Sequence, residues 1–347
     1  MHLEKTFGAI TLACCLLTCI ADAAILRVDR RGGADFTSLR AAAAAAKAGD
    51  TIQIAKGSGP YREMLFVEAS GTEGAPIIIE GNGELVTGFE PLRGFKEENG
   101  RWVCDLPRKY PCVITYQGER LVVSAKTNQP TRYATFNDER TRLILLPGTM
   151  TEGWEISSRG FAVRVYNSSH HVYRNIRASG SLNDAFNLHG KGTGLVFENI
   201  EGFHNLDEGF SAHDEMHCRI KGGKFWGNDN GLANIRDSKM EAEDIDVYAN
   251  LGFGFFLTKC MSRINGLRAW DNGITQIYIG SGCEVSFQNA TAYHPAWAER
   301  QLESYFESRQ SRFSAPVRIN ADNITGKPVT KTAPRPDGES PVAFIIP

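Results

Sequence analysis

The feature that most constrains the fold is a repeat of about 22 residues through the central half of the chain. An aromatic side chain recurs with spacings of 23, 22, 22 and 23 residues, at Phe203, Trp226, Tyr248, Trp270 and Tyr293. An asparagine follows two positions after the first four of them, at Asn205, Asn228, Asn250 and Asn272. A glycine and a short apolar alternation come next in each copy. Such a chain stacks similar units along one axis.

The unit length and pattern favour strands over helices. The Leu-x-x-Leu-x-Leu frame of leucine-rich repeats is absent, and helical repeats need longer units with a period of 3.6. Runs such as 194–200 alternate between apolar and polar residues, as strands do. Three short strands and three turns use about 22 residues, and successive coils lie ~4.8 Å apart. The sequence therefore predicts an all-β fold, a right-handed parallel β-helix with the aromatic ladder inside and the asparagine ladder at a turn.

The flanking segments predict how this solenoid begins and where it is interrupted. Residues 36–47 hold six consecutive alanines and predict a helix that caps the open apolar end. The runs 51–54 and 75–80 predict strands. Residues from about 85 to 160 break the period and contain several prolines, so we expect an irregular insertion there.

The two ends of the chain carry different expectations. Residues 1–23 resemble a signal peptide, with an uncharged apolar run and the small residues Ala21 and Ala23 before a cleavage site. The run is too short to span a bilayer, and we expect a secreted or periplasmic protein without a membrane span. The β-helix domain is predicted over 24–315, with a helical stretch at 296–314 and a C-terminal tail at 316–347.

The charge balance and the cysteines exclude some classes of protein. Lys and Arg number 38 and Asp and Glu number 40, for a net charge of −2, which argues against binding nucleic acid through bulk charge. Five of the eight cysteines follow residue 23, and an odd count excludes complete pairing. Cys104 and Cys112 could form a disulfide. Cys260 and Cys283 lie one coil apart and are expected to be buried and stacked. We expect a monomer.

An acidic patch emerges when two coils are aligned. Residues 181–189 align without a gap on residues 205–213, which stacks Asp184 on Glu208 and brings Asp207 beside them. Carboxylates that close repel unless a cation or a proton lies between them. A cluster of oxygen ligands suits Ca²⁺. We predict a calcium site, although Asp and Asn before Gly also serve as ordinary turn residues, and such a ladder can be purely structural.

The same alignment offers a general base. His189 stacks on His213 beside the acidic patch, and a neutral histidine suits proton abstraction near pH 7. The alternative is a surface histidine pair that only bonds the turns. Arg236 on the following coil is a third candidate. Four arginines could meet an anionic glycan or lie on solvated strand faces, at Arg159, Arg164, Arg174 and Arg177.

Several segments resemble the opening of secreted β-helix polysaccharide lyases: 36–39, 47–52, 61–63 and 75–79. The motifs come nearest to pectate lyase family nine, which holds calcium with Asp-Gly-Phe on one coil and Asp-Asp-Gly-aromatic-Asp on the next. Residues 183–186 and 207–211 fall on those places. The family's last calcium aspartate falls at Ser211, and its catalytic lysine falls near Ala233, where no lysine stands.

Together these features predict an exported, calcium-dependent lyase that cleaves an acidic, uronic-acid-containing polysaccharide by β-elimination. Asp184, Asp207 and Glu208 would hold the metal, and His189, His213 or Arg236 would be the base. A glycoside hydrolase would instead use two of the three carboxylates as acid and as nucleophile or base. A uronate epimerase shares the abstraction of the C5 proton. A non-catalytic glycan-binding protein is the fourth possibility.

Overall fold

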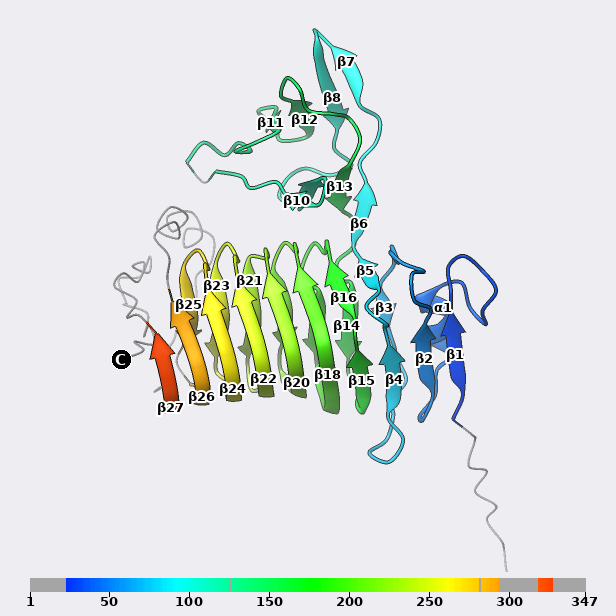
Figure 1. Ribbon diagram of the computed structural model, residues 1–347, viewed down its shortest axis with the longest axis vertical. Helices are drawn as coiled ribbons and strands as arrows, with labels where there is room; N and C mark the ends of the chain where they lie inside the picture. The colour runs from blue at the N-terminus through cyan, green and yellow to red at the C-terminus, as the bar shows by residue number, and fades with distance from the viewer. Residues whose placement is uncertain (1–22, 125, 281, 294–317, 327–347) are drawn as a thin grey trace, which may run out of the picture.

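The computed structural model describes residues 23–124, 126–280, 282–293 and 318–326. Two parallel sheets wind about one axis into a right-handed parallel β-helix, as predicted (Figure 1). Sheet A runs in the order β1-β2-β4-β15-β18-β20-β22-β24-β26-β27, with β5 and β16 beside it. Sheet B runs in the order β25-β23-β21-β19-β17-β14-β3. From β16 to β26 the chain alternates between the two sheets, so each coil there contributes one strand to each.

The strands of sheet A are β1 (Ile25–Val28), β2 (Thr51–Ile54), β4 (Ile77–Glu80), β5 (Leu85–Thr87), β15 (His171–Arg174), β16 (Arg177–Ser179), β18 (Lys191–Phe203), β20 (Glu215–Trp226), β22 (Lys239–Tyr248), β24 (Met261–Trp270), β26 (Glu284–Tyr293) and β27 (Arg318–Gly326). Those of sheet B are β3 (Leu65–Phe66), β14 (Val163–Tyr166), β17 (Phe186–His189), β19 (Glu208–Ala212), β21 (Asn230–Ile235), β23 (Phe253–Thr258) and β25 (Thr275–Ile279).

Alternation along each strand decides what lies inside the coil. In β14, Val163 and Val165 are fully buried in the core, so Arg164 and Tyr166 point outward. Stacked aromatic rings fill the interior along the axis. The ring centroids of Phe186 and Phe210 lie 6.0 Å apart on successive strands of sheet B. Such stacking removes large apolar surfaces from water on every coil.

The asparagine ladder predicted at a turn is present and fully buried. The Nδ2 of Asn205 donates to Oδ1 of Asn228 at 2.8 Å, Asn228 donates to Asn250 at 3.1 Å, and Asn250 donates to Asn272 at 2.8 Å. Gln276 ends the run by accepting from Asn272 at 2.7 Å. Each amide both donates and accepts, so one side chain per coil satisfies the buried polar atoms of the turn.

The aromatic ladder was predicted to lie inside the coil, and that prediction is wrong. Phe203, Trp226, Tyr248 and Trp270 are only half-buried and stand on the outer side of sheet A. Their rings stack face to face, with centroids 4.9, 6.1 and 4.5 Å apart. The residues immediately before them face inward, as Phe225 does at 0% exposure. Ring faces covered by neighbouring rings offer no platform for a sugar.

The N-terminal cap is confirmed as α1 (Leu39–Ala45), which is shorter than predicted. Ser38 caps it by accepting from the Ala41 N–H at 3.1 Å. The Glu63 carboxylate accepts from the N–H groups of Leu39 and Arg40 at 3.0 Å each. Leu39, Ala42 and Ala43 are buried against the core. The helix thus covers apolar surface at the first coils and has its free N–H groups satisfied.

The insertion expected at about 85–160 stands away from the coil at the top of Figure 1. It holds two four-stranded sheets with antiparallel pairing, and its own apolar core includes Trp154 and Phe136. One sheet is formed by β6 (Phe89–Pro91), β9 (Ile114–Tyr116), β10 (Glu119–Arg120) and β13 (Trp154–Ser157). The other is formed by β7 (Lys96–Glu98), β8 (Arg101–Asp105), β11 (Ala134–Phe136) and β12 (Arg142–Leu145).

The C-terminal boundary predicted at residue 315 is too early. β27 pairs in parallel with β26, so sheet A continues to Gly326 within the segment expected to be a tail. The predicted leader over residues 1–22, the predicted helical stretch at 296–314 and residues 327–347 lie outside the described residues. Across the ranges that the structure describes, no helix is both long enough and apolar enough to cross a lipid bilayer.

The two cysteine pairs considered from the sequence differ in their contacts. Cys104 and Cys112 are both buried and free, without the disulfide considered from the sequence. Cys260 and Cys283 are buried and stacked as predicted, with their Sγ atoms 3.8 Å apart.

Candidate active site

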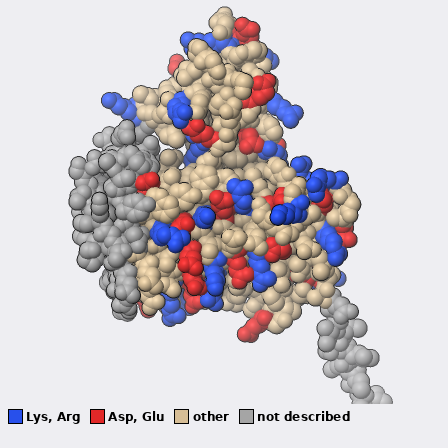
Figure 2. Space-filling model, viewed as in Figure 1, with Lys and Arg blue, Asp and Glu red and all other residues tan. Residues whose placement is uncertain are grey.

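Charged residues on the outer face of sheet A follow a rule. In-register neighbours carry opposite charges from coil to coil, as in the row Arg177, Glu201, Lys224, Asp246 and Arg268. A second row runs Arg174, Glu198, Lys221 and Glu243. Figure 2 shows the intermingled signs on this face. Because neighbouring strands lie only ~4.8 Å apart, alternation turns repulsion into attraction.

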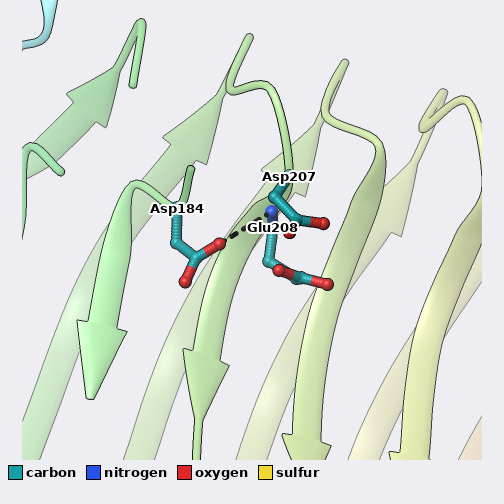
Figure 3. Close-up of side chains that lie close together, drawn as sticks. All are labelled: Asp184, Asp207 and Glu208. Atoms are coloured by element: carbon teal, nitrogen blue, oxygen red, sulfur yellow. Dashed lines mark hydrogen bonds between the residues drawn. The ribbon is translucent and has the colours of Figure 1, made fainter. Parts of the chain in front are cut away.

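The acidic cluster on sheet B breaks this rule. Phe186 pairs with Phe210, which places Asp184 next to Glu208 on the following coil, and Asp207 lies beside them. The three side chains each offer an oxygen within 4.8 Å of the others (Figure 3). Asp184 and Glu208 are buried, at 1% and 6% exposure. Like charges stacked and buried in a fold that elsewhere alternates them mark this cluster as a candidate site.

The local backbone explains how Glu208 reaches the cluster. Gly209 lies against the following coil, where a Cβ would come within 2.7 Å of Asn228 Nδ2 and of the Gly231 carbonyl oxygen. Only glycine fits there, and the strand then places Phe210 in the core. Asn230 Nδ2 donates to Glu208 Oε1 at 2.9 Å and holds that carboxylate. The Asp-Glu-Gly-Phe sequence therefore combines a close coil contact with two acidic side chains.

Asp184 accepts hydrogen bonds from three atoms on three neighbouring residues. Its Oδ2 accepts from Asn187 Nδ2 at 2.6 Å and from Ser211 Oγ at 2.5 Å, and its Oδ1 accepts from the Glu208 N–H at 3.1 Å. Burial raises the pKa of Asp184 above its usual value, and the nearby Asp207 adds to that rise, while these hydrogen bonds oppose it. A positive charge at the cluster would relieve the cost of keeping the carboxylate ionised.

The donor set fits a hard cation. Each carboxylate oxygen has two lone pairs, and Asp184 Oδ1 accepts the Glu208 N–H with one of them. Asp207 and Glu208 add oxygen atoms at the same place. Oxygen ligands without nitrogen or sulfur suit Ca²⁺ rather than zinc or copper. Asp184, Asp207 and Glu208 could therefore hold a metal ion.

The two histidines stack as predicted and are linked to the cluster. The ring centroids of His189 and His213 lie 3.9 Å apart, nearly parallel. His213 Nε2 bonds Ser211 Oγ at 3.1 Å, and Ser211 in turn donates to Asp184. Burial, then the neighbouring His189, lowers the pKa of His213 to about 3. His213 is therefore neutral, and its other ring nitrogen, Nδ1, is buried without a partner.

His189 has the geometry of a base. Its Nδ1 lies 3.1 Å from Asp214 Oδ2. Burial alone would raise the pKa of Asp214, but hydrogen bonds from the Gly190 N–H and from His189 lower it, so this carboxylate is ionised. An ionised carboxylate only accepts, so Nδ1 carries the proton and Nε2 carries the lone pair. Asp214 was not among the residues predicted from the sequence, because only the turn geometry brings it under His189.

Arg236 lies beside Asp214 rather than beside the acidic cluster. Its Nη1 is 3.6 Å from Asp214 Oδ1, and its side chain is largely exposed. This position makes Arg236 a counter-ion of Asp214, and nothing in its contacts favours a role as base. Ser211 and Ala233 occupy adjacent outward positions of sheet B, where family nine has its last calcium aspartate and a catalytic lysine. Both are fully buried, and Ser211 instead joins His213 to Asp184.

A second residue that the sequence did not single out is Arg120 in the insertion. Its Nη1 donates to the carbonyl oxygens of Asn205, at 2.9 Å, and of Gly227. Those carbonyls belong to the turns that lead into Asp207 and Asp229. Arg120 therefore fixes the insertion to the turns beside the acidic cluster. Arg120 is 85 residues from Asn205 and 107 residues from Gly227 in the sequence, so no local pattern indicates these contacts.

Comparison with known proteins shows the fold. No family model matches the chain, and no curated protein sequence matches it significantly. A solved glycoside hydrolase superposes with a TM-score of 0.53 at 10% identity, covering 87% of this chain and 97% of that chain. Pectate lyase Pel9A gives a TM-score of 0.48 at 15% identity, covering 93% and 88%. XylC with xylose gives 0.47 at 11% identity, covering 87% and 68%. The first of these likenesses supports the architecture alone.

Proposed function

We propose that this protein is a polysaccharide lyase that uses calcium to cleave an acidic, uronic-acid-containing polymer by β-elimination, and that it is exported. The observation that carries the proposal is the buried stack of Asp184 and Glu208 beside Asp207, within reach of a histidine that has a free acceptor nitrogen. The resemblance of residues 183–186 and 207–211 to the calcium motif of family nine points the same way.

Each residue then has a defined role. Asp184, Asp207 and Glu208 hold the calcium ion, which would bind the substrate carboxylate and make the C5 proton more acidic when present. His189 accepts that proton at Nε2, while Asp214 fixes its tautomer at Nδ1. His213 and Ser211 connect the histidine pair to Asp184 and hold the ring of His189 from one side. As the electron pair of the C5–H bond forms the C4–C5 double bond, the 4-O-glycosidic bond breaks. The leaving oxygen takes a proton from solvent, and an unsaturated uronide remains.

The test is absorbance near 235 nm, where the unsaturated product absorbs. Pectate, alginate and glycosaminoglycans are each incubated with the protein, with calcium or with a chelator. We expect product from at least one polymer, lost with chelator and reduced by about 100-fold or more in both Asp184→Asn and His189→Gln. The control is Glu198→Gln on sheet A, far from the cluster in the coil cross-section, which should keep wild-type activity.

A retaining glycoside hydrolase is the second candidate. One observation favours it: burial raises the pKa of Asp184, as a general acid requires, and ionisable oxygens of Asp207 and Glu208 lie within 4.8 Å. The same incubations decide between the two reactions. New reducing ends without absorbance at 235 nm would overturn the lyase and support the hydrolase. Absence of both signals on every polymer would overturn both and leave a glycan-binding protein.

A further inference from the structure

The four arginines that could meet an anionic glycan prove to be unlike one another. Arg174 bonds Glu198 at 2.6 Å, Arg177 bonds Glu201 at 2.6 Å, and Arg159 pairs with Glu90. Arg164 has no carboxylate within bonding distance among residues 23–293 that the structure describes, and no hydrogen bond of its guanidinium is formed there. Three of the four charges are thus neutralised by acids of the coil or the insertion, and one is not.

Aromatic rings hold Arg164 in place instead. Its guanidinium carbon lies 5.5 Å from the ring centroid of Phe66, 5.4 Å from that of Phe161 and 5.0 Å from that of Tyr166. The Nε atom is buried among these rings without a partner, whereas the side chain as a whole is half-buried. Cation–π contacts orient a guanidinium without using its N–H donors. Arg164 is therefore a fixed cation that keeps its donors for another group.

The position of Arg164 ties it to the acidic cluster. Val163 and Val165 face the core, so Arg164 points outward from sheet B. Its in-register neighbour on the next strand is Asn187, which bonds Asp184, and the neighbour of Tyr166 is His189. Adjacent strands lie ~4.8 Å apart. The cation therefore stands one coil from the candidate base and from the first metal ligand, on the same outer face.

We propose that Arg164 is an anion-binding subsite, which holds a carboxylate or sulfate on the sugar next to the one bound at the acidic cluster. This inference deepens the proposed function and rests on it, because it takes the substrate to be a charged polysaccharide. A planar guanidinium with free donors can bind either anion through two parallel hydrogen bonds. The substrate class that follows is a polymer with negative charge on consecutive sugars, laid along the β-helix axis.

The experiment measures equilibrium binding of oligosaccharides from pectate, alginate and chondroitin sulfate in the presence of calcium. Each is compared with its neutral form, made by carboxyl reduction and, for chondroitin sulfate, by desulfation as well. Wild-type protein should bind at least one anionic form more tightly than its neutral form. Arg164→Met, which retains the packing among the rings, should weaken anionic binding about tenfold or more and leave neutral binding unchanged. The affinity of Arg164→Lys for the anionic form should lie between those of wild type and Arg164→Met. Lysine keeps the positive charge but lacks the planar pair of N–H donors.

The matched control is Arg174→Met, because Glu198 on sheet A already neutralises Arg174. This variant should bind the anionic oligosaccharides with wild-type affinity. Circular dichroism and calcium titration confirm that each variant is folded and loads the metal. Equal affinity of Arg164→Met and wild type for every anionic oligosaccharide would overturn the subsite, as would a wild type that shows no preference for charge. Binding through Arg164 without any unsaturated product would overturn the lyase and leave the subsite standing. Unsaturated product formed by Arg164→Met with an unchanged KM would overturn the subsite and leave the lyase standing.

Discussion

At the scale of single residues, the turn after each strand of sheet B shows how the backbone positions the contact between Asp214 and His189. The chain adopts a positive φ there on successive coils, at Gly190 (85°), Asp214 (57°), Asp237 (50°) and Lys259 (48°). Glycine and aspartate tolerate this region better than most residues. At Asp214 the conformation directs the carboxylate toward the Gly190 N–H and His189 Nδ1. A turn required by the coil thereby orients the ring of the proposed base.

The buried histidine beside it predicts a pH effect on stability. The folded-state pKa of His213 is about 3, against 6.5 in an unfolded chain, so only the unfolded state gains a proton between those values. The free energy of unfolding therefore falls as pH decreases from about 6.5. In His213→Asn this slope should be shallower by up to about 1.4 kcal/mol per pH unit. Urea unfolding in the presence of a chelator, at several pH values between 4 and 7, measures this slope.

His217 supplies the control for this measurement. It is much less buried, and its pKa is lowered by weaker burial and by Lys239 and Lys191, while Glu215 opposes the change. His217→Asn should leave most of the slope in place. Equal slopes for His213→Asn and wild type would show that His213 takes up its proton in the folded state.

At the scale of the element, the asparagine ladder is the contact that joins one coil to the next. Asn228 accepts from the N–H and Nδ2 of Asn205, and donates to the Gly202 carbonyl and to Asn250. Its side chain is fully buried. Such a ladder propagates only if every coil supplies its amide, which explains why the sequence repeats asparagine at this position.

Replacing one ladder member should therefore be costly. Asn228→Ala removes four buried hydrogen bonds and leaves the Asn205 N–H without its partner, and we expect a loss of about 3 kcal/mol or more in the free energy of unfolding. Asn265→Ala is the control, because Asn265 only accepts one exposed bond from Asn289. It should change stability by about 0.5 kcal/mol or less. Chemical denaturation measures both, and similar losses in the two variants would contradict the role given to the ladder.

At the scale of the whole molecule, the outer faces of the two sheets differ in how their charged residues are arranged. Sheet A carries alternating charges that neutralise one another along the axis, so its face has no net preference for a polyanion. Sheet B concentrates the acids, the histidine pair and the caged Arg164 on two neighbouring coils and their flanking strand. The insertion is fastened beside this face by Arg120. The proposed site thus lies on the sheet B side of the solenoid.

Calcium should consequently stabilise the whole β-helix. Because the three carboxylates come together only in the folded coil, a site filled at 100 times its Kd adds about 2.7 kcal/mol to the free energy of unfolding. Scanning calorimetry with calcium or chelator measures the shift in Tm. Asp184→Asn should abolish most of the shift, whereas Glu198→Gln should keep it. Magnesium should shift Tm less, since it retains its water more strongly. An identical shift in Asp184→Asn would place the ion elsewhere.

The repeat alone determined the coil, the asparagine ladder and the stacking of Asp184 on Glu208, because residues at a fixed spacing in a solenoid must become neighbours along its axis. The tertiary structure decided which face of each strand points inward. Period-two alternation groups residues on one face, but packing against the opposite sheet chooses the buried face. That choice moved Trp226 and its ladder outward and brought Asp214 under His189. Of the four candidate arginines, it left Arg164 without a carboxylate partner among the described residues.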